Sequence, residues 1–428
     1  MTALPPRHTS SPPHTSSPFR TSASGLRRSL PLPVLLAPAA ASTLLALVPV
    51  RHPFAAATAG WALSMPAVEM PLHVGALVGA ATVPALVRRR GRRQRSSDLV
   101  GAGIAALTCA GLGVVFARHL AAAPALERAF AEVQDLPPGS TTTTTPTGPP
   151  PTGPPPTRAR TPWPAVRLTP WAAVLFAPWP GVPRGVRARR RMAYGPDPKA
   201  NRFDLYTRTD GGPARGVLIH IHGGHFRAGG PSRESRAMLF GHASRGWAAI
   251  STTYHLSPTP ESGFPQHLID IKQLIRWVRT EGPAHGIGAG APIVVAGSSA
   301  GAHIAMMCAL TANDPAYQPD FEDLDTSLAG VVGLYGYYGR LGAASKDVSD
   351  PGRLPAAGAP PAAIIHGTLD TYTPVKGSRR LVQHLRAGSS NPVIYAELPG
   401  AQHGFDAVRK PRYSAVVAAV ARFTDRYA

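Results

Sequence analysis

The chain has 428 residues, more than one domain usually contains, so we expect at least two regions of different character. Its formal net charge is +21, but the arginines come with no nucleic-acid-reading motif and no interleaved aromatic residues, which argues against nucleic acid as a partner. The two cysteines, Cys109 and Cys308, are too few for a framework of disulfides.

The N-terminal residues 1–29 are rich in Ser, Thr, Pro and Arg, a composition that predicts a disordered basic tail. An uncharged apolar stretch, 30–50, follows and is about as long as a membrane-spanning helix, although it contains four prolines. Arg27 and Arg28 directly precede it. A cleaved export signal of twin-arginine type is therefore an alternative to a retained helix.

Two further uncharged apolar segments, 71–87 and 99–117, flank an arginine-rich loop at 88–95. Either segment could be a core helix of a soluble domain, but both approach spanning length, and the loop is typical of a cytoplasmic hairpin connection. We therefore predict a membrane region over residues 30–122 with about three transmembrane helices. The stretch around Trp61 and Glu69 carries an acid, which favours an external or interfacial segment.

The positive-inside rule places the tail and the arginine-rich loop in the cytoplasm. With three spans, the chain is then a multi-pass protein of the cell membrane whose C-terminal part lies on the extracytoplasmic side. Residues 123–162 are predicted to be a linker whose Thr and Pro repeats are typical of glycosylated stalks. A plain flexible linker inside the cell is the alternative.

From residue 163 to 428, short apolar runs alternate with helical patterns, which predicts an α/β domain with a mostly parallel sheet flanked by helices. One expected helix is 264–280, with Leu268, Ile271, Ile275 and Val278 on one face. The expected strands are 203–207, 216–221, 248–253, 293–296, 330–335, 362–366 and 393–397.

The strongest local motif is Gly297-Ser298-Ser299-Ala300-Gly301, which lies between an apolar strand and an apolar helix. Small residues on both sides of Ser299 allow the sharp strand-to-helix turn that exposes a nucleophilic hydroxyl, while the helix N-terminus favours developing negative charge. A chance match is common in glycine-rich sequences, so the motif needs the support of others.

A second motif, His222-Gly223-Gly224-His225-Phe226, follows the strand that ends at Ile221. Glycines let backbone N–H groups approach an oxyanion without obstruction. We predict that the N–H groups of Gly223, Gly224 and Ala300 form the oxyanion hole. A plain turn after a strand is the alternative.

An acid and a histidine complete the order Ser, acid, His. Asp370 follows a predicted strand within His366-Gly367-Thr368-Leu369-Asp370, and His403 follows the next strand, so both are expected at the same edge of the sheet. His403 would move the proton of Ser299, and Asp370 would orient the imidazole. Three other acids compete for this role but are placed less well in the chain: Asp347, Asp350 and Asp406.

With these motifs, residues 190–428 resemble the hormone-sensitive-lipase-like carboxylesterases of the α/β-hydrolase superfamily. Tyr254 to Pro258 and Phe264-Pro265 also resemble landmarks of that family. The membrane-plus-hydrolase arrangement is similar, more loosely, to bacterial membrane-anchored Lip-type carboxylesterases. The resemblance implies a serine hydrolase that cleaves carboxylic esters, of small molecules or of lipids, through an acyl-enzyme on Ser299, with no cofactor and no metal.

His225 replaces the third glycine of the family's loop, a departure shared with kynurenine formamidases. An arylformamidase or other amide hydrolase with the same triad is therefore an alternative, as is a catalytically idle membrane-tethered module. The segment 164–186, with Trp171, Phe176 and Trp179, is a candidate cover for the acyl pocket.

The remaining histidines and arginines singled out by the sequence are expected to have structural or surface roles. His220 alternates with apolar neighbours and is expected in the core, while His222 is expected to brace the oxyanion loop. A metal site built from His220, His222 and His225 is disfavoured because these positions point to different faces. The arginines between 187 and 191 are expected to form a solvated face or a contact to anionic lipid.

Overall fold

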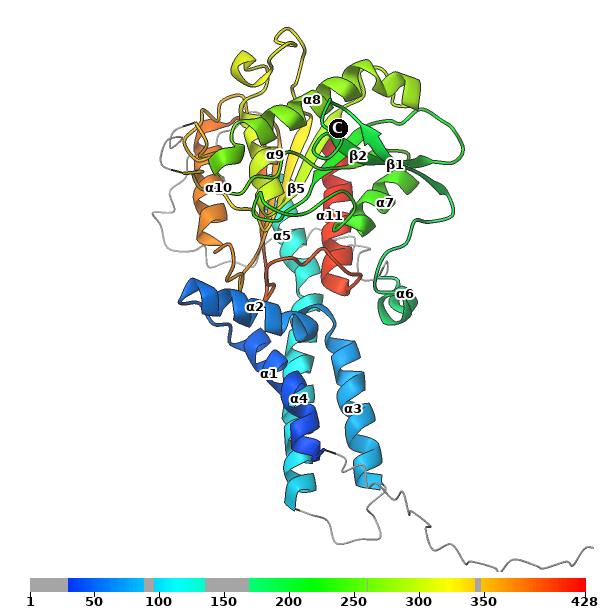
Figure 1. Ribbon diagram of the computed structural model, residues 1–428, viewed down its shortest axis with the longest axis vertical. Helices are drawn as coiled ribbons and strands as arrows, with labels where there is room; N and C mark the ends of the chain where they lie inside the picture. The colour runs from blue at the N-terminus through cyan, green and yellow to red at the C-terminus, as the bar shows by residue number, and fades with distance from the viewer. Residues whose placement is uncertain (1–29, 88–95, 135–168, 260, 343–347) are drawn as a thin grey trace, which may run out of the picture.

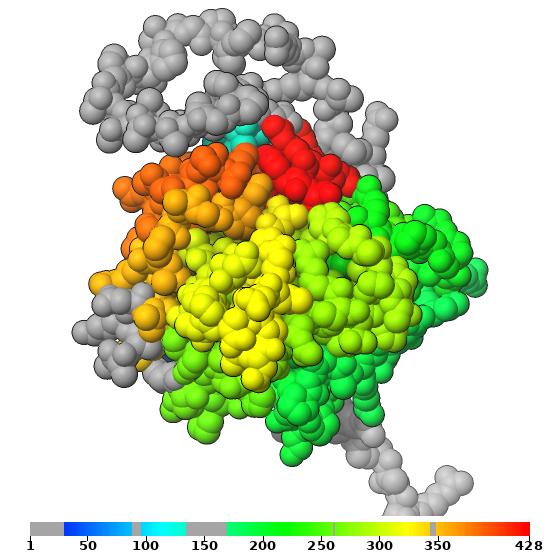
Figure 2. Space-filling view, turned by 90° about the horizontal axis from the view of Figure 1, so that it is seen from above, coloured from blue at the N-terminus to red at the C-terminus, as the bar shows by residue number. Residues whose placement is uncertain are grey.

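The computed structural model describes residues 30–87, 96–134, 169–259, 261–342 and 348–428. The predicted basic tail, the arginine-rich loop 88–95 and the Thr/Pro repeats of the linker lie outside these residues. The described residues form an α/β domain and a group of N-terminal helices beneath it (Figure 1). Seen from the side opposite these helices, most of the coloured surface belongs to the α/β domain (Figure 2).

An eight-stranded mixed sheet forms the centre of the α/β domain, in the order β1-β2-β4-β3-β5-β6-β7-β8. β1 and β2 are antiparallel to their neighbours, and the strands from β4 across to β8 are parallel. This is the α/β-hydrolase fold, which confirms the predicted fold class. The strands are β1 Val186–Ala193, β2 Arg202–Arg208, β3 Val217–Ile221, β4 Ala248–Thr252, β5 Ile293–Ser298, β6 Gly330–Leu334, β7 Ala362–Gly367 and β8 Val393–Leu398.

All seven predicted strands are present. They could be recognised in the sequence because central parallel strands are covered on both faces and appear as continuous apolar runs. Every residue of β3 and β5 is buried. The strand β1 was not predicted. It contains the arginine run 187–191 and lies at the edge of the sheet, where most of its side chains are at least partly exposed and no apolar run is needed.

Helices cover both faces of the sheet. One face packs against α8, α9 and α10, and the other packs against α5, α7 and α11. The predicted helix over 264–280 is α8, which begins at Gln266 and buries its apolar stripe as expected. The helices of the domain are α7 Arg236–Ser244, α8 Gln266–Thr280, α9 Ala300–Leu310, α10 Lys376–Gly388 and α11 Pro411–Tyr427.

Four helices precede the domain: α1 Leu32–Leu47, α2 Phe54–Glu69, α3 Pro71–Val87 and α4 Ser96–Leu120. α1, α3 and α4 extend away from the domain, whereas α2 lies across its lower side (Figure 1). α2 and α3 meet at an angle of 82°. The segment around Trp61, predicted to be external or interfacial, is thus a helix that runs crosswise to the helices below it.

Within the described residues, one helical run of 38 residues, Ser96–Val133, is long and apolar enough to cross a membrane, and an 18-residue stretch of it has a mean hydropathy of 2.2. The bent pair α2 and α3 would count as a second span if taken together. α1 has 16 residues, so it reaches about 24 Å, short of a hydrocarbon core of about 30 Å. One of the three predicted spans therefore has the required length, and the multi-pass arrangement stays a prediction.

Helix α5, Ala122–Gln134, differs from the predicted linker, which was expected to begin at residue 123. Six of its residues belong to the core on one face of the sheet, where α5 contacts β8 and α11: Ala122, Ala123, Leu126, Ala129, Phe130 and Val133. Their helical spacing was visible in the sequence but lies beside the strong Thr/Pro composition that follows. The N-terminal region and the α/β domain consequently share one hydrophobic core.

Candidate active site

Ser299 lies at the turn between β5 and α9 with φ of 55°, a conformation that L-residues seldom adopt. The flanking glycines make this turn possible. A Cβ atom on Gly301 would lie 2.1 Å from the carbonyl oxygen of Ile221, and one on Gly297 would lie 2.1 Å from that of Gly301. A residue larger than glycine would not fit at either position. With glycine there, the chain can turn sharply and place Ser299 beside the loop that follows β3.

The structure brings the three predicted triad residues together. His403 Nε2 lies 2.9 Å from Ser299 Oγ, and His403 Nδ1 lies 2.9 Å from Asp370 Oδ2. Asp370 follows β7 and His403 follows β8, so both loops leave the same edge of the sheet as Ser299. A serine, an imidazole and a carboxylate in this sequence of contacts can transfer the serine proton to the imidazole.

The carboxylate of Asp370 is buried and held by several donors. Its Oδ1 accepts from the backbone N–H groups of Tyr372 at 2.9 Å and Thr373 at 2.8 Å. Burial alone would raise the pKa of Asp370, but the imidazoles of His403 and His366 beside it bring that pKa below its usual value. Asp370 is therefore kept as a carboxylate that faces His403.

The competing acids have other partners. Asp406 accepts from Ser298 Oγ at 2.8 Å and also from Ser235 and Tyr335, so it forms a buried network beneath the turn that carries Ser299. Asp350 accepts from the backbone N–H of Gly352 at 2.9 Å. Asp347 lies outside the described residues. Of the described candidates, Asp370 is the one paired with His403.

The loop after β3 differs from its prediction at Gly223. The N–H of Gly223 donates to Glu234 Oε1 at 2.6 Å, so it is already engaged and is not free to bind an oxyanion. Gly224 has φ of 128°, and His225 also has positive φ, 56°. A Cβ atom on Gly224 would lie 1.7 Å from the carbonyl oxygen of Ala228, which explains the requirement for glycine there. Glu234 carries no local sequence signal and was not predicted.

His222 braces this loop, as its sequence position suggested. Its Nδ1 donates to the carbonyl of Gly223 at 2.6 Å, its Nε2 lies 2.9 Å from Thr253 Oγ1, and its ring stacks on Tyr254 at 4.8 Å. Burial lowers the pKa of His222 to about 3, so the ring is neutral and can both donate and accept. Gly229 leaves the space that the His222 ring occupies.

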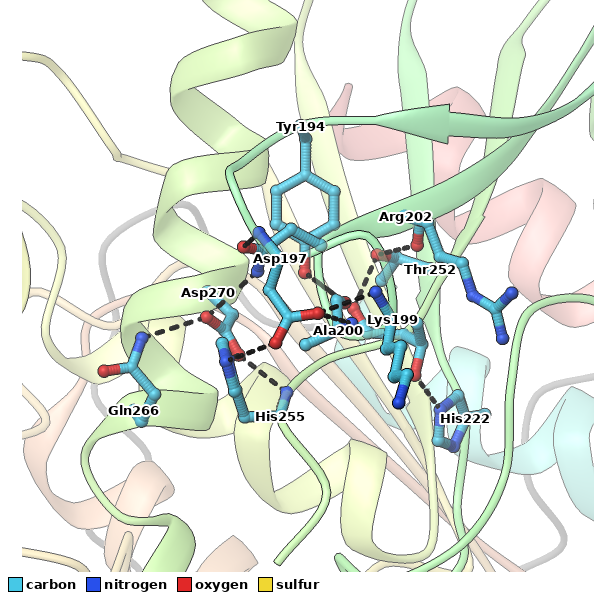
Figure 3. Close-up of polar contacts among 12 residues, drawn as sticks. Tyr194, Asp197, Lys199, Ala200, Arg202, His222, Thr252, His255, Gln266 and Asp270 are labelled. Carbon is cyan, nitrogen blue, oxygen red and sulfur yellow. Dashed lines mark hydrogen bonds and ion pairs between the residues drawn. The ribbon is translucent and has the colours of Figure 1, made fainter.

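A second polar network lies to one side of His222 (Figure 3). Asp270 of α8 is fully buried and accepts from the backbone N–H and the ring Nδ1 of His255, each at 2.7 Å. Asp197 Oδ2 lies 3.3 Å from the other ring nitrogen of His255. These contacts join the loop after β4 to α8. They give His255, within the family-like motif that begins at Tyr254, a structural role.

A pocket of about 250 Å³ opens beside Ser299. The segment 164–186, predicted to cover it, does not line it within the described residues; its helix α6, Trp171–Phe176, instead contacts α3 and α4 through Leu175 and Trp171. Phe54 of α2, which the sequence did not indicate, lines the pocket. The full lining is Phe54, His225, Phe226, Ser299, Ala300, Tyr337, Arg340, Leu341, Tyr372 and Thr373.

Known proteins share parts of this chain. Residues 203–345 match the family described as BD-FAE. Esterase LipC of Mycobacterium tuberculosis (strain ATCC 25618 / H37Rv) is 36% identical over 267 residues, which cover 56% of this chain and 65% of LipC. Esterase LipQ of the same organism is 34% identical over 260 residues, covering 54% and 61%. The chain thus spans about three fifths of the length of these relatives.

Among solved structures, the apo form of Thermogutta terrifontis esterase 2 is 21% identical with a TM-score of 0.47, covering 58% of this chain and 96% of that one. A truncated carbohydrate esterase from gut microbiota is 17% identical with a TM-score of 0.48, covering 58% and 99%.

Proposed function

We propose that this chain is a serine hydrolase that cleaves carboxylic esters. Its α/β domain is homologous to the mycobacterial Lip esterases, and this homology confirms the resemblance seen in the motifs. One observation carries the proposal: Ser299, His403 and Asp370 form an unbroken series of contacts at 2.9 Å and 2.9 Å. They are the proposed catalytic triad. Two of these relatives are named esterase and probable carboxylic ester hydrolase, which supports the same reaction.

In the proposed reaction, His403 accepts the hydroxyl proton of Ser299 while Oγ attacks the acyl carbon of the ester. The tetrahedral intermediate collapses when the protonated imidazole returns that proton to the leaving alcohol, which gives an acyl-enzyme on Ser299. Water, deprotonated by His403, then attacks the acyl carbon, the bond from that carbon to Oγ breaks, and the imidazolium returns the proton to Ser299 as the acid leaves. Asp370 holds the imidazole tautomer and stabilises its charged form throughout.

The oxyanion hole belongs to the same proposal, in a form changed from the sequence prediction. Gly224 and Ala300 keep their proposed roles, and the N–H of His225 takes the place of Gly223, whose own N–H is occupied by Glu234. The positive φ values of Gly224 and His225 support this assignment, because a turn conformation can direct successive backbone N–H groups into an anion-binding concavity.

The pocket supports a short acyl group as the bound part of the substrate. Its volume of about 250 Å³ is at the small end of ligand pockets, and aromatic rings form much of its wall. His225 lies in this wall with its Nδ1 3.3 Å from the hydroxyl of Tyr372. Polar groups beside an aromatic wall also suit an arylformamide, which is the second candidate substrate.

The test uses the full chain in detergent with p-nitrophenyl esters and N-formyl aryl amides. We expect ester turnover that Ser299→Ala abolishes and that the exposed Ser262→Ala leaves unchanged. Faster turnover of the formamides would favour the second candidate. No turnover of either substrate, together with no labelling of Ser299 by a fluorophosphonate, would mean that the chain is an idle module.

Membrane attachment is the other part of the proposal. Helix α4, Ser96–Leu120, supports it, because its 25 residues are enough to span a membrane and it belongs to a helical run with an 18-residue stretch of mean hydropathy 2.2. We place the domain after residue 163 outside the cytoplasm and residues 30–122 in or on the membrane. Protease added to intact cells should cut the Thr/Pro repeats near residues 141–156, and cleavage that occurs only after lysis would reverse the orientation.

A further inference from the structure

We infer that helix α2 of the N-terminal region contributes two residues to the active site. Trp61 positions His403, and Phe54 forms the wall along which an apolar acyl chain lies. The inference rests on the proposed hydrolase function and adds to it. Neither residue belongs to the α/β domain, whose first strand begins at Val186. α2 lies directly beneath that domain (Figure 1).

Trp61 contacts His403 in two ways. Its indole N–H donates to the backbone carbonyl of His403 at 3.0 Å, and its ring meets the imidazole edge-on with centroids 5.9 Å apart. After His403 the chain forms turns, with neither a helix nor a strand before α11 begins at Pro411. A hydrogen bond from outside the domain therefore restrains the backbone of the residue that must transfer the proton.

Phe54 and Trp61 both pack on Tyr372, with ring centroids 5.6 Å and 5.4 Å apart. Tyr372 itself lies 4.9 Å from the His403 ring. Phe54 lines the pocket beside Ser299, yet 58% of its surface is exposed. An exposed aromatic ring at the edge of a small pocket gives an apolar surface to a chain that is longer than the pocket.

The position of α2 is fixed at its other end. Glu69, its last residue, forms a buried ion pair with Lys410 just before α11. Burial lowers the pKa of Lys410, and Glu69 opposes that effect by favouring the charged ammonium. The neighbouring carbonyl of Val68 lies 2.7 Å from Nε2 of His119, at the end of α4. α2 is thus held against the domain from both the α4 side and the α11 side.

These contacts identify the substrate class as esters with an apolar acyl chain that extends past Ser299 onto α2. α2 connects the apolar helices α1 and α3, which are proposed to enter the membrane, and Phe54 is the first residue of α2 on the α1 side. Esters that partition into a lipid surface reach Phe54 without leaving that surface. Shorter esters stay within the pocket and gain less from Phe54, because they do not extend over the exposed part of its ring.

The positioning role is tested with Trp61→Phe in the full chain, which keeps a ring against His403 and removes the N–H donor. We expect kcat for p-nitrophenyl acetate to fall about 5-fold, with KM unchanged, because one hydrogen bond to the His403 loop is lost. The rate of Ser299 labelling by a fluorophosphonate should fall in parallel. The control is Leu63→Ala on the same helix, where the side chain is 63% exposed.

The wall is tested with Phe54→Ala and p-nitrophenyl esters of increasing chain length. We expect kcat/KM for the octanoate to fall about 10-fold and that for the acetate to change less than 2-fold, because only the longer chain extends over the exposed part of the ring. The inference about α2 would be overturned if Phe54→Ala left the chain-length selectivity unchanged and Trp61→Phe left kcat unchanged. If Ser299→Ala still abolished activity in that case, the proposed hydrolase function would stand. Activity that survives Ser299→Ala would instead refute the proposed function.

Discussion

Oγ of Ser299 lies 2.9 Å from Nε2 of His403, although 104 residues separate the two in sequence. The parallel sheet makes this contact possible, because β5 and β8 end at the same edge and each is followed by a loop that carries one of the residues. Asp370 follows β7, the strand beside β8. The proposed chemistry therefore depends on single side chains at one edge of the sheet, and each can be changed separately.

The first prediction concerns Asp370→Asn. The amide keeps the size of the carboxylate but cannot stabilise a protonated His403, and it favours the wrong imidazole tautomer. We expect kcat for p-nitrophenyl esters to fall roughly 10⁴-fold with little change in KM. The matched control is Asp350→Asn, which alters an acid that has no contact with His403, and it should remain active. Equal losses in both variants would contradict the assignment of Asp370.

The second prediction concerns Glu234→Ala. Glu234 holds the N–H of Gly223 at 2.6 Å, and Gly223 is the residue before the proposed oxyanion donor Gly224. Without the carboxylate, the loop loses one of its attachments and the Gly223 N–H loses its acceptor. We expect kcat to fall about 10-fold while KM changes little, because the oxyanion exists only during reaction. Steady-state kinetics beside the exposed Glu281→Ala would check this. Full activity would mean that the loop keeps its position unaided.

The sequence was sufficient to predict the fold and the three residues that meet at the sheet edge. Ser299, Asp370 and His403 each follow an apolar strand within a short motif, so local pattern and chain order indicated their common location. The Gly223 prediction failed for a different reason. Whether a backbone N–H is free depends on what lies opposite it in space, and Glu234 approaches from a loop whose path no local pattern reveals.

The roles of α2 and α5 also could not be read from the sequence. The contact between Trp61 and His403 joins residues 342 positions apart and depends on how a whole helix docks. The apolar stripe of α5, which includes Leu126 and Phe130, has a helical period, but it adjoins the Thr/Pro composition that indicated a linker. Its partner surface is formed only when β8 and α11 have assembled.

The third prediction follows from α5. Phe130 is 2% exposed and packs in the core shared with the sheet, so Phe130→Ala should lower the free energy of unfolding by about 3–5 kcal/mol. The matched control on the same helix is Glu132→Ala, whose side chain is 63% exposed and should cost less than about 0.5 kcal/mol. Thermal unfolding in detergent would measure both.

A soluble fragment that begins at residue 163 should aggregate, since it exposes the face that α5 covers.

The last prediction concerns acid stability. Burial, and then the neighbouring His267, lower the pKa of His303 to about 3, against about 6.5 in an unfolded chain. The folded protein therefore favours neutral His303, so this contribution to stability is complete above about pH 6.5 and is lost, by about 1.4 kcal/mol per pH unit, as the pH falls toward 3. His303→Phe keeps a ring against Phe226 and Tyr337 and removes the titration. The fall in Tm between about pH 7.5 and about pH 5 should be smaller in the variant than in the unaltered protein. An equal fall in the two proteins would show that His303 is not among the groups that take up protons on unfolding.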